Sequence, residues 1–261
     1  MSNQETDTAP RVSTYSYGVV ILLMVVYTFN FLDRQLLSIL SEPIREELNL
    51  SYTQMGMLTG LSFALFYTTF GIPLAWLADR THRVRLIAVA LTTWSLFSMA
   101  CGMATNFVTL ALARIGVGIG EAGGSPPSYS LISDYFPPDK RGGALAIYAL
   151  GVPFGTALGS AAGAQIAALY GWRAAFLAVG IPGVLLAIAL VLIVRERPDE
   201  RLLPWTKGAA SQRNLDLHLG AFGPIIRNLF AAMFTRQTLI LVPALLAVTA
   251  AWGIFLGLAP L

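Results

Sequence analysis

Seven long apolar stretches constrain the fold of this chain more than any other feature. A helix that crosses a lipid bilayer needs about 20 mostly apolar residues. The stretches that meet this requirement lie near Tyr17–Leu40, Gln54–Leu77, Leu86–Met103, Phe107–Ile132, Gly142–Leu169, Trp172–Val194 and Leu239–Leu261. The sequence therefore predicts an all-α membrane protein.

Composition supports this interpretation and excludes an ordinary soluble domain. Of the 261 residues, 56% are hydrophobic and 12% are charged, whereas soluble domains carry about 25% charged residues. The polar N-terminal tail lacks the basic region and small-residue cleavage site of a removable signal peptide. The single cysteine, Cys101, has no partner for an intrachain disulfide and lies inside an apolar stretch.

The positions of the basic residues predict the orientation of the spans. Lysine and arginine concentrate in cytoplasmic connections. Among the basic residues outside the spans, all but Arg45 and Arg173 fall on one side of the predicted spans. We therefore expect a multi-pass integral membrane protein with a cytoplasmic N-terminus, in the inner (plasma) membrane if the source is bacterial.

Four segments make up the predicted organisation. Residues 1–16 form a cytoplasmic tail, and residues 17–195 form a six-span domain. Residues 196–238 form a cytoplasmic linker, which opens with the polar, proline-bearing stretch RERPDERLLPWTK. Residues 239–261 are the first span of an incomplete second domain. Because the sequence ends in apolar residues without a polar tail, we expect a truncated chain.

Four charged residues fall well inside the predicted spans: Asp33 and Arg34 in the first, Arg114 and Glu121 in the fourth. Each would cost about 2.5–3.5 kcal/mol at mid-bilayer even on insertion scales. Arg114 and Glu121 are two helical turns apart and so lie on nearly the same face. We expect the four to face one cavity.

These four residues have two interpretations. They are either structural ion pairs that lock a bundle or a proton-coupling and substrate site, which is the default for intramembrane charges. A carboxyl group such as Glu121 could bind and release a proton as its access to water changes. Phe29, Phe31, Phe63, Phe66 and Tyr67 would supply apolar cavity walls or simply pack helices. No metal and no cofactor is expected; a proton gradient would supply the energy.

Glycine and proline surround Glu121 in the stretch RIGVGIGEAGGSPPSYSLI. Small residues let helices approach closely, and proline bends a helix. We assign helix flexibility to Gly118, Gly120, Pro126 and Pro127. The fifth span carries a separate glycine series with a spacing of four residues, which predicts either close packing or a sliding surface between rocking halves. Its members are Gly151, Gly155, Gly159 and Gly163.

The connection between the second and third spans, LADRTHRVR, predicts a conformational latch at Asp79, Arg80 and Arg83. Cytoplasmic orientation accounts for the arginines but not for Asp79. A carboxylate is favourable near a helix N-terminus, and the fifth span begins on the same side. We expect Asp79 to bind that helix end in one of two conformations.

The same loop is similar to a signature of the major facilitator superfamily, and RIGVGIGE resembles the fourth-span signature of that superfamily. NFLDRQLLSIL, GEAGGSPPS and YALGVPFG resemble its spinster branch, whose members are linked to sphingoid phosphates and lysophospholipids. The resemblance extends over nearly all of residues 17–195. It departs at Ala75 and His82, where the family usually has glycine.

The resemblance implies two six-span halves around a central cavity that alternates its access. It also implies that Asp33, Arg34 and Glu121 line that cavity and handle a proton and an anionic headgroup. This chain would supply the N-terminal half plus one span. A complete pathway would need the missing C-terminal half or a partner chain.

We therefore expect a secondary active transporter for an anionic or amphipathic small molecule such as a lysolipid or sphingoid phosphate. The alternatives are an organic-anion or sugar-acid transporter of the same superfamily, and a non-transporting membrane scaffold. An enzyme is not expected, because the sequence has no HExxH, nucleophile elbow or CxxC motif and both histidines lie in predicted cytoplasmic segments. No nucleic-acid partner is expected.

Overall fold

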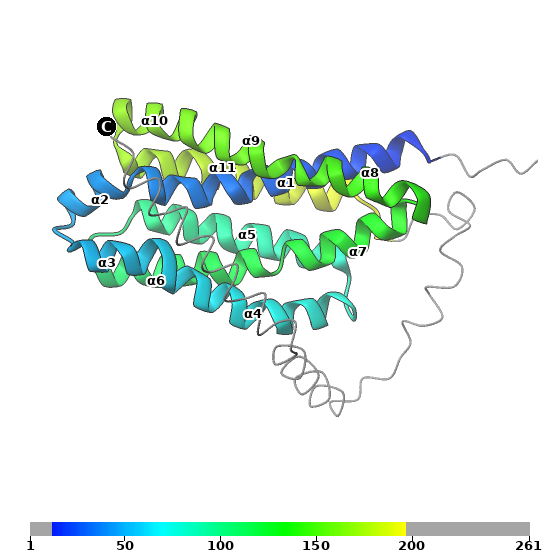
Figure 1. The fold of residues 1–261 in the computed structure, drawn as a ribbon, viewed down its shortest axis with the longest axis horizontal. Coiled ribbons are helices and arrows are strands. Elements are labelled where there is room, and N and C mark those ends of the chain that lie inside the picture. Colours follow the sequence, from blue (N-terminus) through cyan, green and yellow to red (C-terminus); the bar gives the residue numbers. More distant parts are fainter. Residues whose placement is uncertain (1–11, 197–261) are drawn as a thin grey trace, which may run out of the picture. The chain divides into compact units, whose positions relative to one another are not determined.

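The computed structural model describes residues 12–196, and its regular structure over that range is entirely helical (Figure 1). The predicted linker beyond Glu196 and the predicted span at 239–261 lie outside the described residues. Within them, six helical segments are long and apolar enough to cross a membrane: Thr14–Ile39, Tyr52–Ala78, Arg83–Gly102, Phe107–Tyr135, Pro138–Tyr170 and Trp172–Ile193. The first six predicted spans are confirmed as helices, with ends that differ by a few residues.

Several of these spans are divided into shorter helices. The first is α1 (Thr14–Ile39), followed by the short α2 (Ser41–Glu47). The second comprises α3 (Tyr52–Gly56), the π-helix η1 (Met57–Leu61) and α4 (Ser62–Ala78), and the third is α5 (Arg83–Gly102). The fourth comprises α6 (Phe107–Ala122) and α7 (Ser125–Tyr135). The fifth comprises α8 (Pro138–Ala149), α9 (Gly151–Leu158), the π-helix η2 (Gly159–Gly163) and α10 (Ala164–Tyr170), and the sixth is α11 (Trp172–Ile193).

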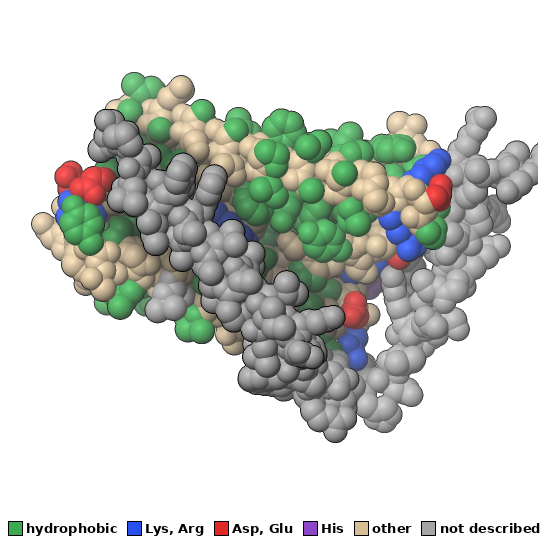
Figure 2. All heavy atoms as spheres, viewed as in Figure 1, with side chains coloured by type: hydrophobic (Ala, Val, Ile, Leu, Met, Phe, Trp, Pro, Cys, Tyr) green, Lys and Arg blue, Asp and Glu red, His purple; other side chains and the backbone are tan. Residues whose placement is uncertain are grey.

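The described helices pack side by side into one bundle (Figure 1). α5 lies between α11 and α6, α6 also contacts α4, and α1 lies against α9 and α11. Many side chains that face the bundle axis are fully buried, such as Leu36 and Leu91, whereas Leu112 on the outside is exposed. In Figure 2 most visible charged side chains gather at the two ends of the bundle, and apolar side chains cover its length. This distribution suits a bundle surrounded by lipid.

The fourth span is interrupted next to Glu121. α6 ends at Ala122, Gly123 and Gly124 form the turn, and α7 begins at Ser125 with proline in its first turn. A Cβ atom at Gly120 would lie 2.7 Å from the backbone nitrogen of Trp94. Glycine is therefore required there for α6 to approach α5 closely. The predicted flexibility of this region, assigned to Gly118, Gly120, Pro126 and Pro127, stays a prediction.

The glycine series of the fifth span faces α1. A Cβ atom at Gly151 would lie 2.8 Å from the carbonyl oxygen of Met24, and one at Gly159 would lie 2.8 Å from the Cβ of Gln35. Gly155 and Gly163 likewise meet α1. Close helix packing, as small residues allow, is thus what these glycines do. The alternative, a sliding surface between two halves, is wrong, because these glycines face α1, which is a helix of the same bundle.

An ion cluster joins α2 to the start of α11. The indole Nε1–H of Trp172 donates to Glu47 Oε2 at 2.5 Å, and Arg173 forms an ion pair with the same carboxylate. Arg173 also donates to the carbonyl oxygen of Ala104 at 3.0 Å. The Trp172 N–H first, and the Arg173 guanidinium second, hold the pKa of Glu47 below its ordinary value of 4.5. Glu47 lies in α2, outside the helical spans, and its partners are the first two residues of the sixth span.

We expect this cluster to make stability depend on pH under acidic conditions. Because the pKa of Glu47 is lower in the folded chain than in the unfolded chain, its contribution is present above pH 4.5 and is lost as the pH falls through the folded-state pKa. Thermal unfolding in detergent should show a falling midpoint in this window, and Glu47→Gln should lose that part of the pH dependence. Glu46→Gln, a neighbouring carboxylate with only a 3.9 Å contact to Arg45, is the matched control. Equal pH profiles for the two variants would contradict this assignment.

Candidate functional site

The four intramembrane charges meet between α1 and α6. Arg114 Nη1 donates to Asp33 Oδ2 at 3.1 Å, and Arg34 Nε donates to Glu121 Oε2 at 2.6 Å. The structure therefore brings together the residues that the sequence predicted would face one another. The two neighbours on α1 pair with two different residues on α6, because consecutive helical side chains point about 100° apart.

The spacing along the helices explains this pairing. Arg114 and Glu121 lie on one face of α6, roughly 10 Å apart along its axis. Asp33 is short and meets Arg114, whose long side chain reaches it. Arg34 is long enough to extend from α1 to the other carboxylate, Glu121. Each charge thereby has a partner of opposite sign.

The Asp33–Arg114 pair is completely enclosed. The side chain of Asp33 is 0% exposed and that of Arg114 is 2% exposed. The hydroxyl of Ser98 on α5 also donates to Asp33 Oδ1. Three helices therefore converge on this carboxylate. The sequence analysis missed Ser98; the available signal was a hydroxyl in an otherwise apolar span.

The Arg34–Glu121 pair is enclosed on one side only. The Glu121 side chain is 0% exposed, whereas that of Arg34 is 27% exposed. Glu121 Oε1 is buried and has no hydrogen-bond partner among the described residues. Arg34 is thus the most accessible of the four charges. Behind it, one carboxylate oxygen of Glu121 accepts no hydrogen bond from the described residues.

Three aromatic rings surround the guanidinium of Arg34. Its Cζ atom lies 5.0 Å from the ring centre of Phe31, 4.9 Å from that of Phe63 and 4.8 Å from that of Tyr67. Cations are attracted to ring faces within about 6 Å. The rings thus hold the guanidinium in place and give the site apolar walls. An anion that reached it would meet a positioned, planar hydrogen-bond donor.

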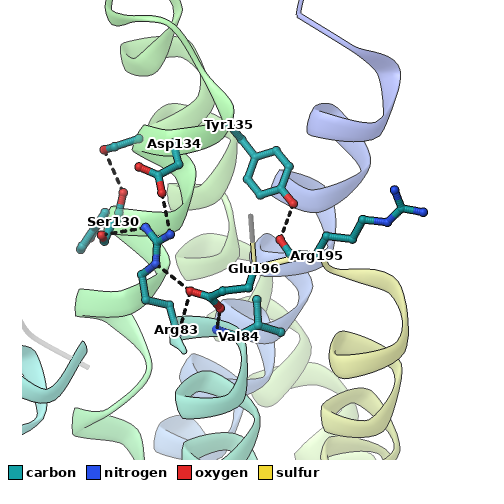
Figure 3. A network of polar contacts seen from close by, with 9 residues as sticks. Arg83, Val84, Ser130, Asp134, Tyr135, Arg195 and Glu196 are labelled. Atoms are coloured by element: carbon teal, nitrogen blue, oxygen red, sulfur yellow. Dashed lines mark hydrogen bonds and ion pairs between the residues drawn. The ribbon is translucent and has the colours of Figure 1, made fainter. Parts of the chain in front are cut away.

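The predicted latch region contains a second charge network, centred on Arg83 (Figure 3). Arg83 is buried, and its guanidinium contacts Asp134 Oδ2 at 2.5 Å, Glu196 Oε1 at 3.1 Å and the Ser130 hydroxyl at 3.1 Å. These partners come from α7 and from the residues after α11. The network therefore connects three spans at one end of the bundle.

The predicted contact of Asp79 is not formed in this structure. Asp79 is exposed and makes no hydrogen bond or ion pair within residues 12–196, and the start of α8 has no side-chain cap. The carboxylate that caps a helix here is Glu196, which accepts from the backbone N–H groups of Arg83 at 2.9 Å and Val84 at 2.8 Å. The first N–H groups of α5 are unsatisfied and carry the positive end of the helix dipole, and Glu196 lies directly beside them.

Near this network, Arg80 lies in the turn after α4, and its Nη1 donates to the Trp76 carbonyl of that helix at 3.2 Å. Two tyrosines fix the end of α11. The Tyr135 hydroxyl donates to the carbonyl of Arg195 at 2.6 Å (Figure 3). The Tyr15 hydroxyl donates to the Ile193 carbonyl at 2.8 Å and accepts from the Arg195 N–H at 2.9 Å. The sequence analysis missed both tyrosines and Glu196, because their partners are distant in the chain.

The described residues contain no group of three or more His, Cys, Asp or Glu side chains arranged to hold a metal ion. The site consists of two ion pairs. One enclosed ion pair, Asp33–Arg114, lies beside the pair formed by the partly exposed Arg34 and the buried Glu121.

Comparison with known proteins gives a family match and several relatives. Residues 23–261 match the family model described as Major Facilitator Superfamily. Over 194 residues the chain is 36% identical to an MFS-type efflux pump of Mycolicibacterium smegmatis, an alignment that covers 74% of this chain and 45% of that protein. It is 34% identical to a probable L-galactonate transporter of Escherichia coli (74% and 42% covered) and 33% identical to a hexuronate transporter of Bacillus subtilis (70% and 43% covered). The chain spans less than half the length of these curated relatives.

Solved structures show the same relationship. A bacterial homologue of the human lysosomal transporter Spinster, in an inward-facing and unoccupied conformation, superposes with a TM-score of 0.65 at 38% identity. The match covers 71% of this chain and 44% of that one. A peptide transporter of the POT type shares the fold at 19% identity, with a TM-score of 0.60 and 92% of this chain covered against 51% of the other.

Proposed function

This chain belongs to the Major Facilitator Superfamily, and from that premise we propose that its six-helix bundle is one half of a proton-coupled secondary transporter for an organic anion. The family match confirms the resemblance carried by LADRTHRVR and RIGVGIGE. The observation that carries the proposal is the Arg34–Glu121 pair, in which a partly exposed cation shields a fully buried carboxylate.

The proposed coupling is an exchange of partners at Arg34. An anionic ligand binds the guanidinium and displaces Glu121 from it. A buried carboxylate without its counter-charge is costly, so Glu121 takes up a proton when the ligand binds. Release of the ligand restores the ion pair and expels the proton. Ligand and proton therefore bind together and leave together.

The enclosed pair has a supporting part in this scheme. Asp33 is held by both Arg114 and Ser98, with no solvent access. It fixes α1 against α5 and α6, so that Arg34 stays opposite Glu121. If the charge of Asp33 changed, the electrostatic effect would reach Glu121 through Arg114, because Arg114 and Glu121 lie on the same face of α6. The four charges therefore form one coupled unit.

Alternating access requires a second bundle, because the pathway of such transporters lies between two halves. We propose that the second half comes from further sequence or from a partner chain. The Arg83 network is the proposed two-state element, closed here around Asp134 and Glu196. The distribution of basic residues supports a cytoplasmic N-terminus and, with it, a cytoplasmic position for this network.

Two ligand classes fit an arginine within aromatic walls. Galactonate and hexuronate, named for two of the relatives, are carboxylates with a compact polar body. A lysolipid or sphingoid phosphate has a phosphate group and a long apolar chain. Arginine binds both carboxylate and phosphate well, so the shared chemistry is an oxyanion. The aromatic rings of Phe31, Phe63 and Tyr67 support either a sugar ring or an acyl chain.

The test is ligand-linked proton uptake by the purified full chain in weakly buffered detergent solution. Titration with a hexuronate in one arm and with a lysophospholipid in the other identifies the class that binds. We expect proton uptake with the preferred ligand, its loss in Glu121→Gln with ligand binding retained, and loss of binding in Arg34→Gln. Glu42→Gln, an exposed carboxylate on α2, is the control.

Each contrary result removes a part of the proposal. Unchanged proton uptake in Glu121→Gln would exclude this residue as the proton carrier. Unchanged affinity in Arg34→Gln would exclude the anion site. If neither ligand class bound, the organic-anion proposal would be wrong and a non-transporting scaffold would be the better description of this chain.

A further inference from the structure

An apolar groove runs along the outside of the bundle between α5 and α11. Its volume is about 390 Å³, within the range of about 300–1,000 Å³ that is usual for small-molecule sites. Small side chains form part of its lining and leave it open. The lining residues are Ala88, Val89, Thr92 and Thr93 on α5 and Ala187, Ile188, Val191 and Leu192 on α11.

The groove faces away from the charged site. On α5, Leu91 and Trp94 are buried and Ser98 contacts Asp33, so this face points into the bundle. Val89 on the opposite face is 63% exposed, and Ile188 on α11 is 54% exposed. The hydroxyl of Thr92 donates to the Ala88 carbonyl at 2.8 Å and is thereby satisfied within its own helix. The groove is therefore an apolar depression on the surface that lipid would contact.

A cation lies at one end of this groove. Arg85 precedes Ala88, Val89 and Thr92 by three, four and seven residues, which places it on the same face of α5. It is exposed and makes no hydrogen bond or ion pair with the described residues. Val89 is about 6 Å and Thr93 about 12 Å further along the helix axis. Arg195, just after α11, is also exposed at this end, and its side chain points away from the Arg83 network (Figure 3).

We propose that this groove binds an acyl chain of an anionic phospholipid whose phosphate contacts Arg85. The combination of a cation at the predicted cytoplasmic surface with an apolar channel beneath it matches an anionic headgroup joined to a hydrocarbon chain. Basic positions next to transmembrane helices on the cytoplasmic side attract such lipids. The site is separate from the Arg34–Glu121 pair and does not depend on the proposed transport function.

The size of the groove favours an extended chain over a protein helix. A single helical turn is about 10 Å across and 5.4 Å long, so it would already occupy a volume close to that of the whole groove. An acyl chain is much thinner and can follow the length of the groove from Arg85 inward. A second copy of this chain, docked through a helix, is the competing occupant.

The experiment is native mass spectrometry of the full chain in detergent with equal amounts of phosphatidylglycerol and phosphatidylcholine. We expect phosphatidylglycerol to be retained preferentially. Arg85→Gln should weaken that retention about fivefold, as expected for one basic residue at a membrane surface. Lys140→Gln, which removes an exposed charge at the start of α8, is the matched control and should leave the preference unchanged.

A second pair of variants tests the groove itself. Val89→Trp places a large ring in it and should remove retention of both lipids. Leu112→Trp adds the same ring at a comparably exposed apolar position on α6, 61% exposed against 63% for Val89, and should have no effect. Equal effects of Arg85→Gln and Lys140→Gln, or of the two tryptophan variants, would overturn the proposal. A dimer that Val89→Trp abolishes would assign the groove to a second copy and overturn it as well.

Discussion

Replacing Arg114 with methionine should destabilise the folded chain by about 3–5 kcal/mol, because it leaves Asp33 buried without its counter-charge. Asp33 is 0% exposed, and Ser98 alone remains to bind it. The free energy of unfolding of the purified chain, measured by chemical denaturation in detergent, is the readout. The same change at Arg80, whose guanidinium contacts Trp76 of the adjoining helix α4, should cost far less.

A double variant separates a structural contribution from a simple loss of stability. Apolar replacement of both members of a buried ion pair is often neutral, so Asp33→Leu combined with Arg114→Met should be more stable than Arg114→Met alone. This non-additivity is the signature of a direct interaction. Strictly additive effects of the two single changes would contradict the pairing seen here. Ligand-linked proton uptake by the double variant then shows whether the enclosed pair is needed for coupling.

Gly155→Ala should be the second severe change, with a loss of at least about 3 kcal/mol, at the upper end of overpacking effects. A Cβ atom at this position would clash with the backbone carbonyl of Thr28, and a backbone atom cannot rotate away as a side chain can. α1 would have to move from α9, and α1 carries Asp33 and Arg34. The thermal unfolding midpoint in detergent measures the effect.

Gly143→Ala is the matched control in the same span. Nothing lies within 4 Å of a Cβ atom built at Gly143 in α8. The change should stabilise the helix by up to about 1 kcal/mol, because alanine has the higher helix propensity. The two glycine-to-alanine changes therefore have opposite expected signs. A similar loss at both positions would show that helix packing at α1 is not what the glycine series provides.

The spans could be predicted from the sequence because the bilayer sets their length. Each of the first six predicted stretches is helical in the structure, although several are divided into shorter helices, and the bounds differ by a few residues at the ends. Arg83 and Pro138 begin their helices a few residues earlier than hydropathy indicated. Glu196 caps the first of these helices, and proline suits the first turn of the second. Such end effects depend on polar contacts that hydropathy does not record.

The charged site was predictable in part. The high cost of isolated charges in lipid required Asp33, Arg34, Arg114 and Glu121 to find partners, and they did. Depth along a helix follows from residue number, so compatible depths could be read from the sequence. Their functional roles stay predictions. The latch shows the limit of this reasoning, since Asp79 was expected to cap a helix and Glu196 caps one instead.

The sequence by itself determined which segments are helical spans, how far along its span each charge lies and which residues permit close packing. Only the tertiary structure decided how each helix is rotated and which helices are neighbours. The rotation of the helices and their arrangement as neighbours together produce the enclosure of Asp33 by Ser98, the aromatic walls around Arg34 and the groove between α5 and α11. They depend on contacts between residues far apart in the chain, such as α1 with Gly155 and Trp94 with Gly120. Local patterns do not specify such contacts, because an apolar helix face can pack against any other apolar face of matching shape.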